Sequence, residues 1–252
     1  MQGLISLGNL PAADLAALIF IVIAWALTGW LVEHPPKSRP SVTILMQEYR
    51  RDWMRAFVTR SPRIFDATLI DSHRQSSAFF ASASMIAIGG GAALIGNSAA
   101  MQELAADLPL DAGQVGITVR ILLPLAFMAN ALLKFIWSHR LFGYCSILMA
   151  AVPNAPDDPQ AFPRAAQAAE INITAAKSYN RGMRAVYFAL AALAWVLGAG
   201  ALGLATAIAV LVMLRREFRS YSREVILHGG QGGHGSSALT GVIASEEARQ
   251  GR

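Results

Sequence analysis

Three polar side chains interrupt an apolar run at residues 115–138. They are Arg120, Asn130 and Lys134. Such side chains are costly inside a hydrocarbon layer, so they often line an ion or substrate path or bind a neighbouring helix. Asn130 and Lys134 are four residues apart and would share one helix face. Lys134 is close enough to the end of the run to reach the membrane surface, which makes structural anchoring the simpler interpretation.

A second set of candidates combines basic, aromatic and polar side chains that we expect beside the inner membrane surface. Part of the set falls in residues 43–59, where Leu45, Tyr49, Trp53 and Phe57 recur every four residues. A helix with this stripe could lie on an anionic leaflet or dock a partner, or it could pack the stripe against its neighbours. The sequence leaves these alternatives open. The full set is Tyr49, Arg50, Arg51, Trp53, Arg55, Phe57, Asp71, His73, Arg74, Arg140, Asn180 and Arg181.

The sequence lacks the motifs of several enzyme classes. It has no phosphate-binding Gly-rich loop ending in Gly-Lys-Ser/Thr, and no H-E-x-x-H, C-x-x-C or G-x-S-x-G. The single cysteine, Cys145, excludes an internal disulfide and a four-thiolate metal site. Near the inner ends of the expected spans the acidic residues are Glu33 and Asp71, so a carboxylate pair for acid–base catalysis is not evident. We predict no cofactor and no metal site; an enzyme is possible but unsupported.

The composition is that of a membrane protein. Of the 252 residues, 54% are apolar and 15% are charged, against about 25% charged residues in soluble domains. Apolar residues form long runs at 12–32, 77–97 and 115–138, and runs of about 18 or more predict transmembrane helices. The sequence therefore predicts an all-α, polytopic integral membrane helical bundle with cytoplasmic helical extensions.

A fourth uncharged run covers residues 185–214 and has glycines at its centre. One straight helix of this length would be about 45 Å long, whereas the hydrocarbon core is about 30 Å thick. Glycines allow a tight reversal at low steric cost. We predict a hairpin of two inserted segments, about 183–198 and 202–218, that forms either two thin spans or a re-entrant loop.

Basic residues are distributed unevenly along the chain. Eight of the 21 Lys and Arg residues lie in 33–76, six in 134–184 and four in 215–223, while 1–32 and 98–114 hold none. Loops rich in Lys and Arg stay in the cytoplasm. We therefore predict a plasma (bacterial inner) membrane protein with the N-terminus outside and the C-terminus in the cytoplasm. The positive charge is explained by this topology, and no nucleic-acid partner is predicted.

The remaining segments complete the expected organisation. We predict cytoplasmic helices at about 43–60, 139–152 and 160–181, and the Pro-rich stretch "PNAPDDP" separates the last two. Together with the inserted segments they would form a single membrane domain at 1–227. Residues 228–252 are dominated by Gly and Ser and predict a flexible tail.

Several stretches carry a family resemblance through their order and spacing. They are "EYRRDWM", "RIFDATLIDSHRQSSAFFASAS", "KFIWSHRLFGYC", "YNRGMRAVYFAL" and "LRREF". With them the chain resembles the domain of unknown function 599 family of bacterial and plant membrane proteins, over most of residues 30–225. Members often carry a Gly-Pro-type break between two late apolar halves, where this chain has "LGAGALG". The resemblance implies a multi-pass membrane fold and supplies no catalytic residues to transfer.

Three functional hypotheses follow from these observations. The first is a non-enzymatic membrane subunit or scaffold whose basic cytoplasmic face contacts anionic lipid headgroups, a membrane-protein partner or a second copy. The second is an oligomeric small-solute or ion transporter that uses Arg120, Asn130 and Lys134. The third is a membrane enzyme acting at the inner leaflet.

Overall fold

The protein is built from helices throughout its described part. A computed structural model describes residues 11–97 and 116–228, and no strand occurs within them. Four helical segments of this part are long and apolar enough to cross a membrane. The predicted all-α membrane bundle is thereby confirmed, whereas the predicted tail beyond residue 228 and the acidic loop at 98–114 lie outside the described residues. The elements are α1 (Ala12–Glu33), α2 (Val42–Thr59), α3 (Ile64–Gly96), α5 (Ile117–Ala150), α6 (Ala161–Leu193), the 3-10 helix η2 (Ala194–Leu197), α7 (Ala199–Phe218) and α8 (Tyr221–His228).

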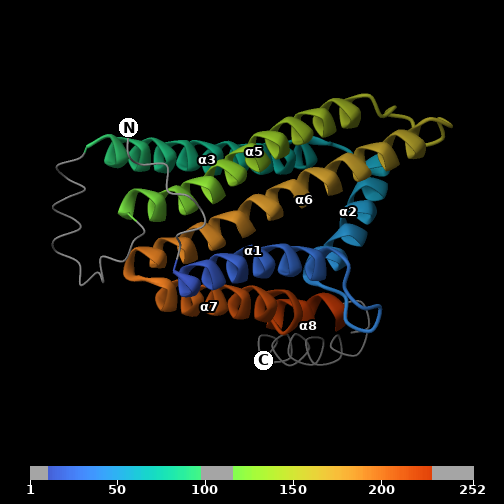
Figure 1. Cartoon of the computed structure of the whole chain (residues 1–252). Helices are drawn as coiled ribbons and strands as arrows, with labels where there is room; N and C mark the ends of the chain where they lie inside the picture. Colours follow the sequence, from blue (N-terminus) through green and yellow to red (C-terminus); the bar gives the residue numbers. More distant parts are fainter. Residues whose placement is uncertain (1–10, 98–115, 229–252) are drawn as a thin grey trace, which may run out of the picture.

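The long helices run side by side and α2 lies across one end of them (Figure 1). Helix α5 packs against α3 on one side and α6 on the other, while α1 packs against α7 and α6. We call the end that carries α2 the basic end. It comprises α2, the C-terminal ends of α1, α5 and α7, and the N-terminal halves of α3 and α6.

Three long helices continue past the predicted membrane boundaries into the basic end. Helix α3 begins at Ile64, 13 residues before the predicted span at 77–97, which adds about 20 Å of helix. Helix α5 joins the predicted segments 115–138 and 139–152 without interruption. Helix α6 likewise joins 160–181 to most of 183–198. The junction in α5 and the junction in α6 both lack a proline, which would break the helix, so each helix continues without interruption.

Small residues let α5 and α6 approach each other closely. A Cβ atom built on Gly182 of α6 would lie 2.8 Å from Cε1 of Phe135 on α5, far inside van der Waals contact. Nearer the basic end, Ala161, Ala165 and Ala168 of α6 are fully buried against α5 and α2. The Ala-rich composition of this helix thus serves packing rather than solvent exposure.

The chain reverses direction at Gly198. Its backbone has φ 115° and ψ 173°, a combination that is essentially restricted to glycine. Helix α6 and η2 reach this turn, and α7 returns from it beside α1 (Figure 1). The turn lies within the glycine-rich segment where the sequence predicted a hairpin.

The aromatic stripe of α2 is only partly buried. Phe57 is buried and Trp53 is half-buried, but Tyr49 remains 46% exposed. A four-residue spacing advances about 40° more than one helical turn at each step, so the stripe winds away from the buried face. That face is completed by Met54 and Val58.

Candidate functional site

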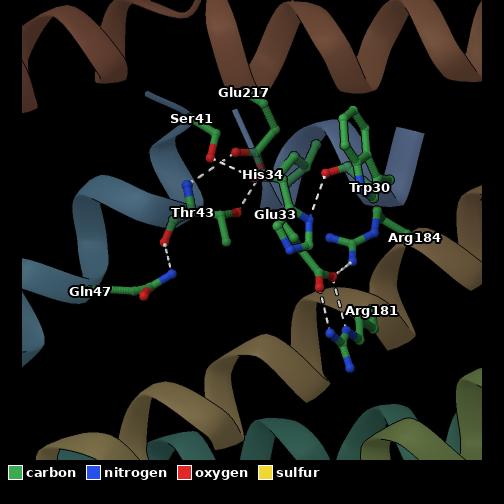
Figure 2. A network of polar contacts seen from close by, with 10 residues as sticks. Trp30, Glu33, His34, Ser41, Thr43, Gln47, Arg181, Arg184 and Glu217 are labelled. Atoms are coloured by element: carbon green, nitrogen blue, oxygen red, sulfur yellow. Dashed lines mark hydrogen bonds and ion pairs between the residues drawn. The ribbon is translucent and has the colours of Figure 1, made fainter. Parts of the chain in front are cut away.

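A two-arginine clasp holds the end of α1 at the basic end. Arg181 donates from Nε to Oε1 of Glu33 at 2.9 Å, and its Nη2 bonds Oε2. Arg184 donates from Nη2 to Oε1 of the same carboxylate, so two guanidinium groups of α6 converge on it (Figure 2). The side chains of Arg184 and Glu33 are only 10% and 14% exposed. The clasp ties α1 to α6 at the level where α1 leaves the bundle.

A second carboxylate caps the start of α2. Thr43 donates from its backbone nitrogen and its hydroxyl to the two carboxylate oxygens of Glu217 on α7, at 3.1 and 3.0 Å (Figure 2). Ser41 accepts from the Ile44 nitrogen and donates to the Val32 carbonyl at 2.7 Å. A negative charge at a helix N-terminus is favourable because it meets unpaired backbone N–H groups. Glu217 therefore fixes α2 against α7 and has both of its oxygens occupied.

A third carboxylate, Asp66, locks the corner between α2 and α3. It is fully buried and accepts hydrogen bonds from Trp53 Nε1, at 2.6 Å, and from Arg60. In the same corner, Arg63 donates to the carbonyls of Val58, Val152 and Pro153 at 2.9 to 3.0 Å. These bonds hold α2 on the ends of α3 and α5. Because they fix the helices of the basic end against one another, we also call the basic end the platform.

Arg50 and Arg51 face different environments on α2. Arg51 donates from Nε to Glu170 on α6 at 2.8 Å. Arg50 instead turns inward and bonds the neutral side-chain oxygen of Asn172. Burial lowers the pKa of Arg50, because the charged form loses solvation there. No carboxylate in the described residues lies within ion-pair distance of Arg50, so its charge is not neutralised.

Two adjoining cavities, of 370 and 250 Å³, lie where α1, α2, α6 and α7 meet. They share Val42, Asn180 and Glu217 as lining residues, and we call them together the basic groove. Four cationic side chains line it along with the single carboxylate of Glu217. The cationic residues are Arg50, Lys177, Arg184 and Arg216.

A separate cavity of 310 Å³ lies between α3 and α5 on the platform. Its lining combines apolar groups such as Ile70 with the charged side chains of Arg63, Asp71 and Arg74. We call it the platform cavity. It opens on the same two helices that carry exposed apolar side chains beyond the predicted spans.

Several residues predicted for the inner surface turn into the protein instead. Trp53 bonds the buried Asp66, and Arg50 bonds the buried Asn172. Phe57 is buried beneath Arg63, whose Cζ lies 4.5 Å from the ring centre. His73 stacks on Phe142 of α5 with ring centres 5.1 Å apart. These side chains hold the platform together rather than presenting themselves to a ligand.

Other predicted residues do lie at the surface of the basic end. Tyr49 donates from its hydroxyl to the Ile226 carbonyl of α8 at 3.2 Å. Arg55 is exposed beside Asp52 at 3.1 Å. Three others keep local partners or line a cavity: Arg74 lies 3.9 Å from Asp71, Arg140 bonds the Tyr144 hydroxyl, and Asn180 lines the basic groove.

The three intramembrane candidates do not form one site. Arg120 is buried near the opposite end of the bundle and donates to the Val196 carbonyl of η2 at 3.3 Å. Lys134 is 14 residues further along α5, about 21 Å away. Asn130 and Lys134 are half-buried, and the Lys134 carbonyl accepts from Ser178 of α6 at 2.8 Å. Arg120 acts as a link between α5 and η2.

Sequence reasoning missed the acidic residues that organise the bundle. Asp14 and Trp195 are both buried, and Trp195 donates from Nε1 to Asp14 at 2.6 Å. Glu33, Asp66 and Glu217 play comparable roles at the basic end. The sequence did contain a signal for these contacts, because an isolated carboxylate within or beside an apolar run needs a hydrogen-bond or ion-pair partner. The sequence does not say which donor that partner is.

The comparisons with known proteins agree with this architecture. The model of the family described as "Protein of unknown function, DUF599" matches residues 16–222. This range runs from the first turns of α1 to the start of α8 and includes every residue of the clasp, of the Asp66 corner and of the lining of the basic groove. No curated protein and no solved structure matches the chain. Because the family match covers most of the chain, the chain belongs to the DUF599 family of proteins of unknown function.

Proposed function

We propose that the protein is a non-enzymatic membrane scaffold or subunit whose platform docks a partner protein. One observation carries the proposal: the helices that would cross the membrane continue into a fixed platform that exposes large apolar side chains. The platform is held by the buried Asp66 corner and the Glu33 clasp. A rigid surface of this kind is suited to binding a partner without reorganisation.

The distribution of charge supports a cytoplasmic position for the platform. The segments 33–76, 134–184 and 215–223, which hold 18 of the 21 Lys and Arg residues, lie toward one end of the bundle (Figure 1). Basic segments are retained on the cytoplasmic side. The N-terminus would then be outside and α8 inside, in a plasma membrane. This orientation places the exposed part of the platform in reach of soluble and membrane-bound partners.

The exposed apolar side chains are the expected contact points. Ile64, Phe65 and Ile147 are 72%, 64% and 67% exposed. Ile64 and Phe65 precede the predicted span at 77–97 by about 20 Å of helix, so lipid tails would not cover them. Exposed apolar side chains gathered outside the membrane mark protein interaction sites.

The chemistry of the partner follows from the neighbouring charges. The guanidinium of Arg60 lies 5.7 Å from the ring centre of Phe65 and is paired with the buried Asp66. Arg63 and Arg74 line the platform cavity with one carboxylate, Asp71, which leaves an excess of one positive charge in the lining. An apolar segment flanked by acidic residues would match this surface, because charges of opposite sign steer and orient the encounter.

Site-specific photocrosslinking tests the proposal. A photoreactive amino acid replaces Phe65 in one version of the full-length chain and Phe79 in another. Phe79 is 66% exposed but lies within the predicted span at 77–97. In native membranes, position 65 should give a protein adduct of one defined mass, and position 79 should not.

Two outcomes would contradict the proposal. Position 65 could fail to give any protein adduct in membranes where the protein is expressed at its natural level. Alternatively, both positions could give the same set of adducts, which would indicate random collisions within the membrane.

A further inference from the structure

We propose that the basic groove binds the phosphate group of an anionic glycerophospholipid from the leaflet beside the basic end. This inference goes beyond the proposed function, which concerns the platform surface on α3 and α5. Either can fail without the other, because the basic groove lies between α1, α2, α6 and α7.

The charges of the groove match a phosphate ligand. Arg184 is held by Glu33, and the Glu217 carboxylate is occupied by Thr43. Arg50 and Arg216 bond only neutral groups, the Asn172 amide and the Tyr187 hydroxyl. Within the described residues, no carboxylate lies within 4.0 Å of the charged nitrogens of Arg50, Lys177 or Arg216.

Neutral hydrogen-bond donors complete the lining. Asn180 stands between the two cavities and contributes a side-chain amide to both. Ser220 and Ser222, from the link between α7 and α8, add hydroxyl groups to the larger cavity. Guanidinium, ammonium, amide and hydroxyl groups are the donors that hold phosphate oxygens in proteins.

The position of the groove favours a lipid over a soluble ligand. Its lining includes Val32, Met183 and Met213, each on a helix that runs on into the apolar bundle. On α7, exposed Ile208 and Leu211 come just before Arg215 and Arg216. A ligand with an anionic head and an apolar body fits this change from apolar to cationic lining. Basic pockets between transmembrane helices bind lipid headgroups in the same way.

Lipid titration of the delipidated full-length protein tests the inference. Phosphatidylglycerol and phosphatidylcholine are added in mild detergent, and native mass spectrometry counts the bound lipids. We expect tighter binding of phosphatidylglycerol. Lys177→Gln and Arg216→Gln should each weaken it about fivefold, since one cation beside an anionic headgroup contributes on the order of 1 kcal/mol.

One control and one blocking variant separate a site from general surface charge. The control, Arg55→Gln, removes one positive charge from the same end, where Arg55 is exposed beside Asp52 outside the groove, and should leave binding unchanged. Asn180→Phe fills the groove without changing charge and should abolish the preference for phosphatidylglycerol.

Several results would overturn the inference. Equal loss of binding in Arg55→Gln and Arg216→Gln would mean diffuse surface attraction. Equal affinity for the two lipids would exclude a phosphate-selective site for anionic lipid. Competition by soluble glycerol phosphate at the affinity of the lipid would mean that the ligand is soluble. If Asn180→Phe fails to fold, the titrations of Lys177→Gln and Arg216→Gln still test the inference, because Lys177 is partly exposed and Arg216 is exposed.

Discussion

Arg184 of α6 and Glu33 of α1 form an ion pair in which both side chains are largely withdrawn from solvent. Arg181 bonds the other oxygen of the same carboxylate. The pair joins residues 151 positions apart in the chain. It ties α6 to α1 where α1 ends and the link to α2 begins, and its Arg184 also lines the basic groove.

Glu33→Gln should destabilise the protein strongly. The substitution leaves the buried Arg184 guanidinium without a countercharge, and breaking such a pair costs about 3 kcal/mol of unfolding free energy. Thermal unfolding in detergent measures the effect. Glu48→Gln is the matched control: Glu48 is 70% exposed and pairs with Arg51, so its loss should cost less than about 1 kcal/mol. Equal effects of the two substitutions would contradict the structural role of the clasp.

Trp195→Phe should destabilise the opposite end of the bundle. It removes the donor to Asp14, and an unsatisfied buried acceptor costs about 1 to 3 kcal/mol. Asp14→Asn retains an oxygen that accepts the indole N–H and should cost less. A thermal unfolding series that includes the double variant would show the coupling, and additive effects of the two substitutions would argue against the bond between Trp195 and Asp14.

Gly198→Ala should be much worse than Gly200→Ala. At Gly198 the backbone has φ 115°, and a side chain in this region costs on the order of 1 to 3 kcal/mol. Gly200 lies inside α7, and a Cβ there meets nothing within 4 Å. Alanine at that position should stabilise the helix by about 0.5 to 1 kcal/mol. Thermal stability ranked in the reverse order would show that the chain does not turn at Gly198.

A reporter fusion tests the orientation of the chain. A reporter that is active only outside the cytoplasm, fused after Arg223, should be silent, because α7 returns the chain to the basic end. The same reporter fused within 98–114 should be active, since this segment has no Lys or Arg and three acidic residues. Reporter activity after Arg223 would mean that this part of the chain lies outside the cytoplasm, which would contradict the predicted orientation.

Much of the fold could be predicted because apolar runs are properties of whole segments. The position of the turn was predictable for the same reason, since glycines mark the centre of residues 185–214. The continuation of α5 beyond Ser138 was also predictable, since the helical pattern runs on through residues 139–152 before a Pro-rich break, and the helix ends at Ala150.

The site was less predictable because it depends on pairs distant in the chain. Arg50 was expected at the surface with Arg51 and Arg55, yet it turns toward Asn172, 122 residues away. Glu217 faces Thr43 across 174 positions. Helical periodicity indicates that such residues share a face, but it does not identify the helix on the other side.

The central claim, that the platform docks a partner protein, is tested most directly by co-purification. The full-length chain is isolated from native membranes in mild detergent, and mass spectrometry measures the stoichiometry of associated proteins. The account predicts one protein in a fixed ratio, lost with Phe65→Glu and retained with Phe79→Leu, a substitution within the predicted span at 77–97. Isolation of the unsubstituted protein as a lone monomer, or an associated protein equally retained in both variants, would contradict it.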